Sequence, residues 1–300
     1  MAKSKGKGAR ILVFGAHPDD CEFMAGGLAA LCVRHGLTIK FVSMTNGDTG
    51  HYQMGGGELA RRRYAETRAS AKVLGIEYEV VDQHCGELMP TLEHRRFVIR
   101  TIRLFKPDLV LTHTPDDYHP DHRYTSTLVQ DSAYSVTVPG QVALTPHLNC
   151  NPVYGYICGT ITKSPMFAPT VFLDLDGVMS KKFRMLCCHE SQFLEWIPYN
   201  QNVLHKVPKG RAARRKWMTD WFAARMRQVA EFYRPQIVRQ YGPKRGARIR
   251  YVEAIQFSPL GSEVDARGVR RLLPFVPAPK RAVPDEVARS RWVRPPSRRK

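Results

Sequence analysis

A short apolar run that ends in a His-Pro-Asp-Asp motif places the strongest constraint on this chain. Residues 11–14 are all apolar, and a glycine follows them. Such a run is typical of a buried strand in a parallel sheet. His17, Asp19 and Asp20 come directly after it. Because ligands of open α/β sheets bind outside the carboxyl ends of the strands, this motif predicts a functional site at the end of the first strand.

Apolar and helix-like segments alternate along the first half of the chain. Further strands are expected over residues 39–44, 77–81 and 108–112, and helices over 24–35, 58–74, 93–105 and 123–134. Strands that alternate with helices are typical of βαβ units. The sequence therefore predicts an α/β fold, with a Rossmann-like, mainly parallel sheet and helices on both faces.

The second half of the chain is less regular. Strands are expected over residues 151–158, 170–173 and 250–257, and helices over 178–188 and 211–233. No clear linker divides residues 9–258, so we expect one domain there. A basic flexible N-terminus over residues 1–8 and a basic Pro- and Arg-rich tail over residues 259–300 are expected to flank it.

The formal net charge of +19 is concentrated at the two ends of the chain. Residues 1–10 and 267–300 together carry thirteen of these net positive charges, in segments rich in glycine or proline. Such ends can touch anionic surfaces without specificity. The chain has no base-stacking or helix-turn-helix pattern. We therefore expect solvated tails and no specific nucleic-acid partner.

The chain lacks the sequence features of a secreted or membrane protein. No apolar run approaches the ~18 residues of a transmembrane helix, and no apolar signal segment follows the basic N-terminus. The seven cysteines include no CxxC pair, which favours reduced thiols over a disulfide framework or a zinc ribbon. The sequence predicts a cytoplasmic protein without a transmembrane segment.

A second loop rich in histidine and aspartate follows a later predicted strand. It contains His119, Asp121 and His122. In a parallel sheet this loop can open on the same edge as His17 and Asp20. Imidazole nitrogens and carboxylate oxygens are suitable zinc ligands, and a catalytic zinc takes three protein ligands and a water. From the residues alone, His17, Asp20 and one histidine of the second loop meet that count.

The remaining polar groups of the two loops suit hydrolytic chemistry. Asp19 can take a proton from a water whose pKa a metal has lowered. The remaining histidine of the second loop can stabilise an oxyanion or protonate a leaving group. Taken singly, each His-Pro-Asp segment is explained better by a turn. Two such segments at predicted strand ends favour a metal site, for which iron or manganese are alternatives to zinc.

The two motifs together resemble the PIG-L/LmbE-like family of zinc-dependent N-acetylglucosaminyl deacetylases. The resemblance rests on residues 16–20 and 119–122 and covers residues 9–195. Supporting matches are residues 45–48, Arg63 with Glu66 and residues 74–75, residues 189–192 and, more weakly, residues 252–254.

The resemblance implies a role for each residue of the first motif. His17 and Asp20 correspond to zinc ligands, and His122 of the second motif corresponds to the third ligand. Asp19 corresponds to the general base that deprotonates the attacking water. The cofactor implied is therefore Zn²⁺.

The resemblance also implies roles around the metal. His119 corresponds to the histidine that stabilises the oxyanion, and Asp121 is expected to pair with it and hold it charged. Asp48 and Arg63 lie at positions where the family contacts its sugar substrate.

Residues 82–88 depart from the Asp-Gly-x-Leu segment usual in the family. His84 and Cys85 are the unusual residues. They can alter substrate choice or add a redox-sensitive contact, although chance placement on a loop is the stronger explanation. Trp196 is a candidate wall for a sugar ring, although core packing is the stronger explanation for any tryptophan.

The function implied is that of a metal-dependent hydrolase that removes the N-acetyl group from an N-acetylglucosamine-type sugar or glycoconjugate. The family resemblance is compatible with a homo-oligomer. One alternative is a related zinc amidase that acts on a thiol conjugate or another amide. The other is a basic-tailed metal-binding protein without catalysis. Metal content separates the last from the first two, and acetate release separates the first from the second.

Overall fold

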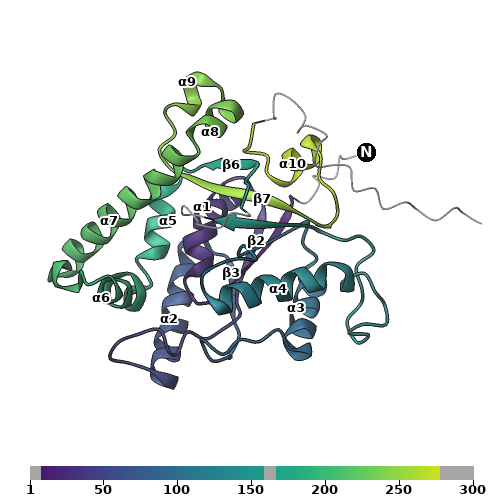
Figure 1. Ribbon diagram of the computed structural model, residues 1–300, viewed down its shortest axis with the longest axis horizontal. Coiled ribbons are helices and arrows are strands. Elements are labelled where there is room, and N and C mark those ends of the chain that lie inside the picture. The colour runs from purple at the N-terminus through teal and green to yellow at the C-terminus, as the bar shows by residue number, and fades with distance from the viewer. Residues whose placement is uncertain (1–7, 159–166, 278–300) are drawn as a thin grey trace, which may run out of the picture.

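A seven-stranded, mainly parallel sheet organises the protein (Figure 1). The computed structural model describes residues 8–158 and 167–277. The strands are β1 (Arg10–Gly15), β2 (Thr38–Ser43), β3 (Glu77–Val80), β4 (Leu109–Thr112), β5 (Val153–Cys158), β6 (Val171–Asp174) and β7 (Val252–Gly261), in the order β3-β2-β1-β4-β5-β7-β6. The first five strands pair in parallel, and β7 is antiparallel to both β5 and β6.

Helices cover both faces of this sheet, as expected. They are α1 (Asp20–Arg34), α2 (Gly56–Leu74), α3 (Leu92–Phe105), α4 (Pro120–Ser135), α5 (Met179–Leu186), α6 (Ile197–Asn200), α7 (Arg211–Phe232), α8 (Arg234–Tyr241), α9 (Pro243–Gly246) and α10 (Ala266–Leu272). A π-helical turn, η1 (Ser191–Trp196), and a 3₁₀ turn, η2 (Leu204–Lys206), lie between α5 and α7.

The residues of β1 alternate between two hydrophobic cores, because successive strand side chains point to opposite faces. Ile11 and Val13 pack in the core that contains residues of α1, α2, α5 and α7. Leu12 and Phe14 pack in the core that contains residues of α3 and α4. All four side chains are fully buried. The apolar run at residues 11–14 therefore lies in the middle of the five parallel strands of a two-faced α/β fold.

Two helices begin earlier than the sequence pattern predicts, and the difference concerns the motifs. Helix α1 begins at Asp20 and α4 at Pro120, whereas helices were expected from residues 24 and 123. Proline suits the first helical turn because its missing amide is not needed there. The ends of both His/Asp motifs therefore lie on the first turns of helices, and not on loops as expected.

A buried ion pair joins the last strand, β7, to the middle of α1. Glu253 on β7 accepts hydrogen bonds from the amides of Gly27, at 2.8 Å, and Leu28, at 2.7 Å. Lys182 on α5 donates to Glu253, at 2.6 Å, and to the carbonyl of Phe23, at 2.7 Å. A Cβ at Gly27 would lie only 2.9 Å from Glu253 Oε1, so the absence of a side chain allows this approach. The pair thereby fixes α1 against β7 and α5.

The folded part of the chain extends beyond the boundary expected at residue 258. Strand β7 continues to Gly261, and α10 places Val269 and Leu272 in the core that contains α1. Residues 259–277 therefore belong to the fold and not to a flexible tail. The expected solvated ends over residues 1–7 and 278–300 lie outside the described residues. Among the described helices, none is both long and apolar enough to cross a membrane.

Replacing Lys182 by methionine is expected to destabilise the fold strongly. The substitution leaves the Glu253 carboxylate buried without its cation, and breaking a buried pair in this way costs about 3–5 kcal/mol. The free energy of unfolding, measured by urea denaturation, reports the loss. The matched control is Lys216→Met, which removes an exposed pair with Asp220 and should cost less than about 0.5 kcal/mol. Equal costs for the two variants would contradict the structural role of the buried pair.

Candidate metal centre

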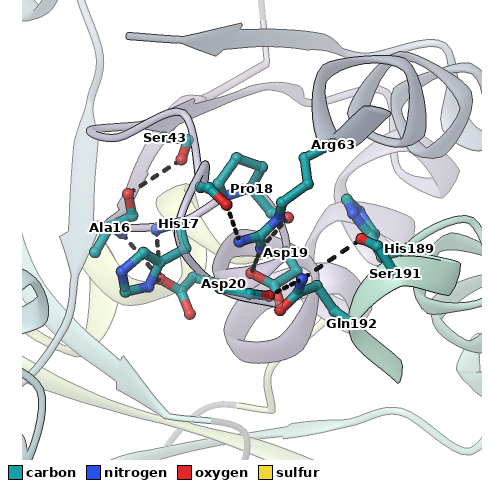
Figure 2. A network of polar contacts seen from close by, with 12 residues as sticks. Ala16, His17, Pro18, Asp19, Asp20, Ser43, Arg63, His189, Ser191 and Gln192 are labelled. Carbon is teal, nitrogen blue, oxygen red and sulfur yellow. Dashed lines mark hydrogen bonds and ion pairs between the residues drawn. The ribbon is translucent and has the colours of Figure 1, made fainter. Parts of the chain in front are cut away.

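Main-chain amides fix the carboxylate of Asp20 at the end of β1. Its Oδ2 accepts hydrogen bonds from the amides of Ala16, at 3.1 Å, and His17, at 2.7 Å. The tight turn is closed by the carbonyl of His17, which accepts from the amide of Asp20 at 3.1 Å. Figure 2 shows the Asp20 carboxylate beside Ala16 and His17. Asp20 is therefore held in place by the backbone of its own motif.

Three donor atoms from the two motifs converge on one point. His17 Nδ1 and Asp20 Oδ2 are 3.2 Å apart, and His122 Nε2 lies 3.4 Å from that oxygen. The two imidazole nitrogens are 3.2 Å apart. Ligand atoms of a tetrahedral zinc, each 2.0–2.1 Å from the ion, are about 3.3 Å from one another. The spacing of these three atoms therefore fits a single divalent ion.

A buried carboxylate orients His17. Asp121 is fully buried, and its Oδ2 lies 3.1 Å from His17 Nε2 and accepts from the amide of Gly86 at 2.6 Å. A proton on Nε2 leaves Nδ1 free to ligate, an arrangement that is common around metal-bound histidines. Asp121 was expected to pair with His119. That expectation is wrong, because His119 is the N-cap of α4 and its Nδ1 accepts only the main-chain amide of Asp121, at 3.1 Å.

His122 has two supporting neighbours that the sequence analysis did not identify. Its Nδ1 lies 2.9 Å from Asp117 Oδ1, so this carboxylate orients the second imidazole as Asp121 orients the first. His113, which follows β4 directly, stacks on the His122 ring with centroids 4.0 Å apart. His113 Nε2 accepts from the amide of Ala16 at 3.0 Å and lies 3.4 Å from Asp20 Oδ2. In the sequence, the one indication that His113 lies at the site was its position directly after a predicted strand.

The carboxylates of the cluster favour positive charge at the two convergent histidines. Burial lowers the pKa of His122, but Asp20 and Asp117 outweigh this effect and raise it to about 9. The pKa of His17 is also raised: burial lowers it, and Asp20 and Asp121 more than compensate. Because protons and a divalent cation compete for the same nitrogens, the electrostatics of the cluster suit a cation.

Burial, followed by repulsion from His17 and His122, lowers the pKa of His119 to about 4. This shift favours the neutral imidazole, whereas the resemblance implied that Asp121 holds His119 charged. Its neutral form still carries one N–H group, on Nε2, because Nδ1 accepts a hydrogen bond from the amide of Asp121. His119 can therefore donate a hydrogen bond from a ring that is in edge-on contact with His17, with centroids 4.6 Å apart.

Arg63 on α2 holds Asp19 beside the cluster. Its Nη2 donates to Asp19 Oδ1 at 2.8 Å and to the carbonyl of Pro18 at 3.0 Å (Figure 2). Burial raises the pKa of Asp19, and the Arg63 cation opposes that rise. Gly47, whose φ is 75°, makes room for the guanidinium, because a Cβ there would collide with it. Arg63 is only 2% exposed, so it acts on Asp19 from inside the protein.

Asp48 holds the loop that carries His84 and Cys85. It is 3% exposed, its Oδ2 lies 2.5 Å from His84 Nδ1, and its Oδ1 accepts from the amide of Cys85 at 3.0 Å. The next residue, Gly86, donates its amide to Asp121. Asp48 thus connects the loop after β2 to the loop that supports Asp121.

The segment around His189 is attached to the two helices that carry site residues. His189 Nε2 lies 2.7 Å from Glu22 Oε1, and both residues are fully buried. Ser191 donates its hydroxyl to Glu66 at 2.5 Å. These contacts tie the segment to α1 and α2, the two helices that carry Asp20 and Arg63. They give His189 and Ser191, for which the sequence suggested no role, a structural function.

The Trp196 ring belongs to an aromatic stack. Its centroid lies 6.0 Å from that of Tyr199, which stacks on Tyr52 with centroids 4.2 Å apart. Trp196 is half-buried in this stack. Trp196 therefore packs against other rings and is not part of the hydrophobic cores of the described residues, so neither core packing nor a sugar wall is decided by this contact.

The fold and the cluster define a class of protein: an α/β protein with a His/Asp centre at the carboxyl ends of β1 and β4. The family model described as PIG-L: GlcNAc-PI de-N-acetylase matches residues 12–133. The diacetylchitobiose deacetylase of Thermococcus kodakarensis is 30% identical over 213 residues, which are 65% of this chain and 76% of that protein. The chain belongs to the PIG-L/LmbE-like family of deacetylases.

Two further comparisons show how widely this fold is used. The 4-oxalmesaconate hydratase of Pseudomonas putida is 25% identical over 203 residues, which are 65% of this chain and 78% of that protein. The solved structure of N,N′-diacetylchitobiose deacetylase from Pyrococcus horikoshii has a TM-score of 0.64 at 23% identity, covering 84% of each chain. Since one relative is named a hydratase, the reaction must be argued from the site and not from the fold.

Cation binding at the cluster is expected to compete with protons. A metal binds the neutral imidazole, and the pKa of His122 is raised to about 9. The affinity for zinc should therefore fall steadily as the pH is lowered below about 9, with protons released on binding. Isothermal titration calorimetry in buffers of different ionisation enthalpy measures both quantities. An affinity independent of pH, with no proton release, would place the ion elsewhere.

Replacing Asp121 by asparagine is expected to weaken metal binding about 10–100-fold, because outer partners of metal-binding histidines contribute that much. The expected cause is the lost orientation of His17 by the Asp121 carboxylate. The matched control is Asp131→Asn on the same helix, where the aspartate is exposed. Competition with a chromogenic chelator measures both affinities. If the two variants bind zinc equally tightly, Asp121 does not support a ligand.

Proposed function

We propose that this protein is a zinc-dependent N-deacetylase that removes the acetyl group of an N-acetylglucosamine-type sugar or glycoconjugate. His17, Asp20 and His122 are the proposed metal ligands. The observation that carries the proposal is the mutual spacing of 3.2–3.4 Å between their donor atoms. The similarity to a diacetylchitobiose deacetylase supports the substrate class.

The donor set of two imidazoles and one carboxylate suits zinc, and also iron or manganese. Zinc bound there supplies a Lewis acid for the acetamide carbonyl and a water whose pKa falls to about 7. The rest of the reaction depends on the side chains of this chain.

Asp19 is the proposed general base. Its carboxylate adjoins the ligand Asp20, and its bond to Arg63, at 2.8 Å, favours the ionised form that accepts a proton. Asp19 takes one proton from the attacking water as the water oxygen bonds to the acetamide carbon. The same proton then passes from Asp19 to the amine nitrogen as the C–N bond breaks. The second proton of the water, left on the acetic acid formed, then passes to the amine. The products are acetate and the protonated amino sugar, so the step is balanced without another reactant.

His119 is the proposed oxyanion donor. Since its Nδ1 accepts the amide of Asp121, its Nε2–H group is available to the acetamide oxygen as negative charge develops there. A neutral imidazole acts here as a hydrogen-bond donor and not as an acid, which is why the amine proton is assigned to Asp19. Removing one such donor typically costs 10²–10³ in rate.

Arg63 and Asp48 are proposed to serve the substrate site by positioning other residues. Both are buried; the Arg63 Nη atoms and the Asp48 carboxylate are bonded to the protein. Arg63 holds Asp19. Asp48 orients His84, whose side chain is 67% exposed. Direct contacts with the sugar are therefore assigned to the exposed His84 and to Tyr118, which is 85% exposed and borders His119.

Replacing Asp19 by asparagine is expected to lower kcat by about 10²–10⁴, the usual contribution of a general acid or base. Zinc should remain bound, because Asp19 is not one of the convergent ligands. Turnover is measured at equal metal content, determined by elemental analysis. Normal turnover by this variant would refute the assignment of Asp19 as the base.

The proposed reaction is tested by acetate release from a panel of amides. The panel contains N-acetylglucosamine, diacetylchitobiose, an N-acetylglucosaminyl lipid and an acetylated thiol conjugate, with zinc-loaded His122→Ala protein as the control. Acetate from the amino sugars alone supports the proposal. Turnover of the thiol conjugate alone selects the related amidase. A separate assay of water addition to an unsaturated dicarboxylic acid tests for a hydratase. Metal binding without turnover in either assay selects a binding protein.

A further inference from the structure

The unusual loop at His84 and Cys85 brings a thiol close to the His17 ring. Donor atoms of His17, Cys85 and Asp121 lie within 4.8 Å of one another, and all three residues are buried. The proposed zinc ligands use Nδ1 of His17, whereas the Asp121 carboxylate of this second group lies at Nε2. Cys85 and Asp121 provide no ligand to the first group.

The second group has the geometry of a cation site. His17 Nε2 and Asp121 Oδ2 are 3.1 Å apart, close to the separation of about 3.3 Å expected for two ligands of one tetrahedral ion. The other oxygen of Asp121, Oδ1, is buried and has no hydrogen-bond partner in the described part of the chain. A buried acceptor without a partner costs free energy, which a bound cation would recover.

The main chain holds Cys85 in place for this role. Its amide donates to Asp48 at 3.0 Å, and its carbonyl accepts from the Thr49 hydroxyl at 3.1 Å. The amide of Gly86 donates to Asp121 at 2.6 Å. The thiol and the carboxylate are therefore fixed relative to each other by the same short loop.

We propose that Cys85, Asp121 and Nε2 of His17 form a second metal site, and that a thiophilic divalent cation bound there inhibits the enzyme. Zinc in excess of one equivalent and cadmium are the cations that a thiolate and an imidazole select over magnesium or calcium. The proposal rests on the proposed function in one respect, the use of His17 Nδ1 by the first ion.

Inhibition follows from the shared imidazole. Binding removes one proton from the Cys85 thiol and one from His17 Nε2, and both protons pass to solvent. The hydrogen bond that orients His17 through Asp121 is then replaced by a metal bond. The His17 imidazole would then bind one cation at each nitrogen. Repulsion between the two positive charges weakens the bond between His17 and the first ion.

Cadmium titration of the full-length, zinc-loaded protein tests the proposal without an activity assay. Equilibrium dialysis is expected to show a second bound ion, accompanied by the ultraviolet charge-transfer band of a cadmium thiolate. Cys85→Ser should lose the band and bind the second ion at least about tenfold more weakly, since loss of even an outer partner costs that much. The single variant Cys150→Ser and the double variant Cys187→Ser/Cys188→Ser remove thiols elsewhere in the chain. Both proteins should retain the charge-transfer band and the affinity for the second ion.

A band and an affinity unchanged in Cys85→Ser would overturn the proposal, as would a stoichiometry that stays at one ion. If the Cys85 variant does not fold, X-ray absorption of cadmium decides the question. It uses the protein in which Cys150, Cys158, Cys187 and Cys188 are replaced by serine. One sulfur ligand supports the site, and only nitrogen and oxygen ligands exclude it.

Inhibition is measured separately from binding. The concentration of zinc that halves acetate release should rise at least about tenfold in Cys85→Ser, relative to that variant's own activity at one equivalent of zinc. An inhibitory concentration equal to that of the unaltered chain would overturn the inhibitory role. A protein that binds the second cation but releases no acetate from any substrate would refute the proposed function and leave the second site intact.

Discussion

The hydrogen bonds from the amides of Ala16 and His17 to one oxygen of Asp20 are the constraint on which the site depends. They exist because β1 ends in a tight turn and α1 begins at Asp20 itself. The same oxygen lies 3.4 Å from His122 Nε2, so the second motif is assembled around an atom that the first motif has already positioned. The buried Asp121 and the partly exposed Asp117 then orient the two imidazoles. Rigid main chain and outer partners of this kind are what preorganise a catalytic centre.

The sequence was sufficient to predict the fold where local pattern and tertiary packing agree. The apolar run at residues 11–14 is short, continuous and followed by glycine and proline, which together identify a strand buried on both faces. The end of the fold was harder to predict. Residues 259–277 are basic and rich in turn formers, yet Val269 and Leu272 complete the core beside α1. That contact joins residues far apart in the chain, and no local pattern encodes it.

Within the site, residue types and strand ends predicted which side chains meet, but not how they pair. His17, Asp20 and His122 converge because their strands are adjacent. The partner of Asp121 was predicted wrongly, because the capping geometry of α4 turns this carboxylate toward His17. His113 was missed although it directly follows a predicted strand, because it lies outside both His-Pro-Asp segments. Such choices depend on helix starts and ring orientations, which a sequence pattern locates only to within a few residues.

The central claim is that one ion lies between the two motifs and retains a position for water. Anomalous diffraction at the zinc edge, from crystals grown with one equivalent of zinc, tests it most directly. A single peak is expected about 2.0–2.2 Å from His17 Nδ1, Asp20 Oδ2 and His122 Nε2, with no fourth protein atom in contact. A peak at any other group of residues, or a tetrahedron closed entirely by protein atoms, would contradict it.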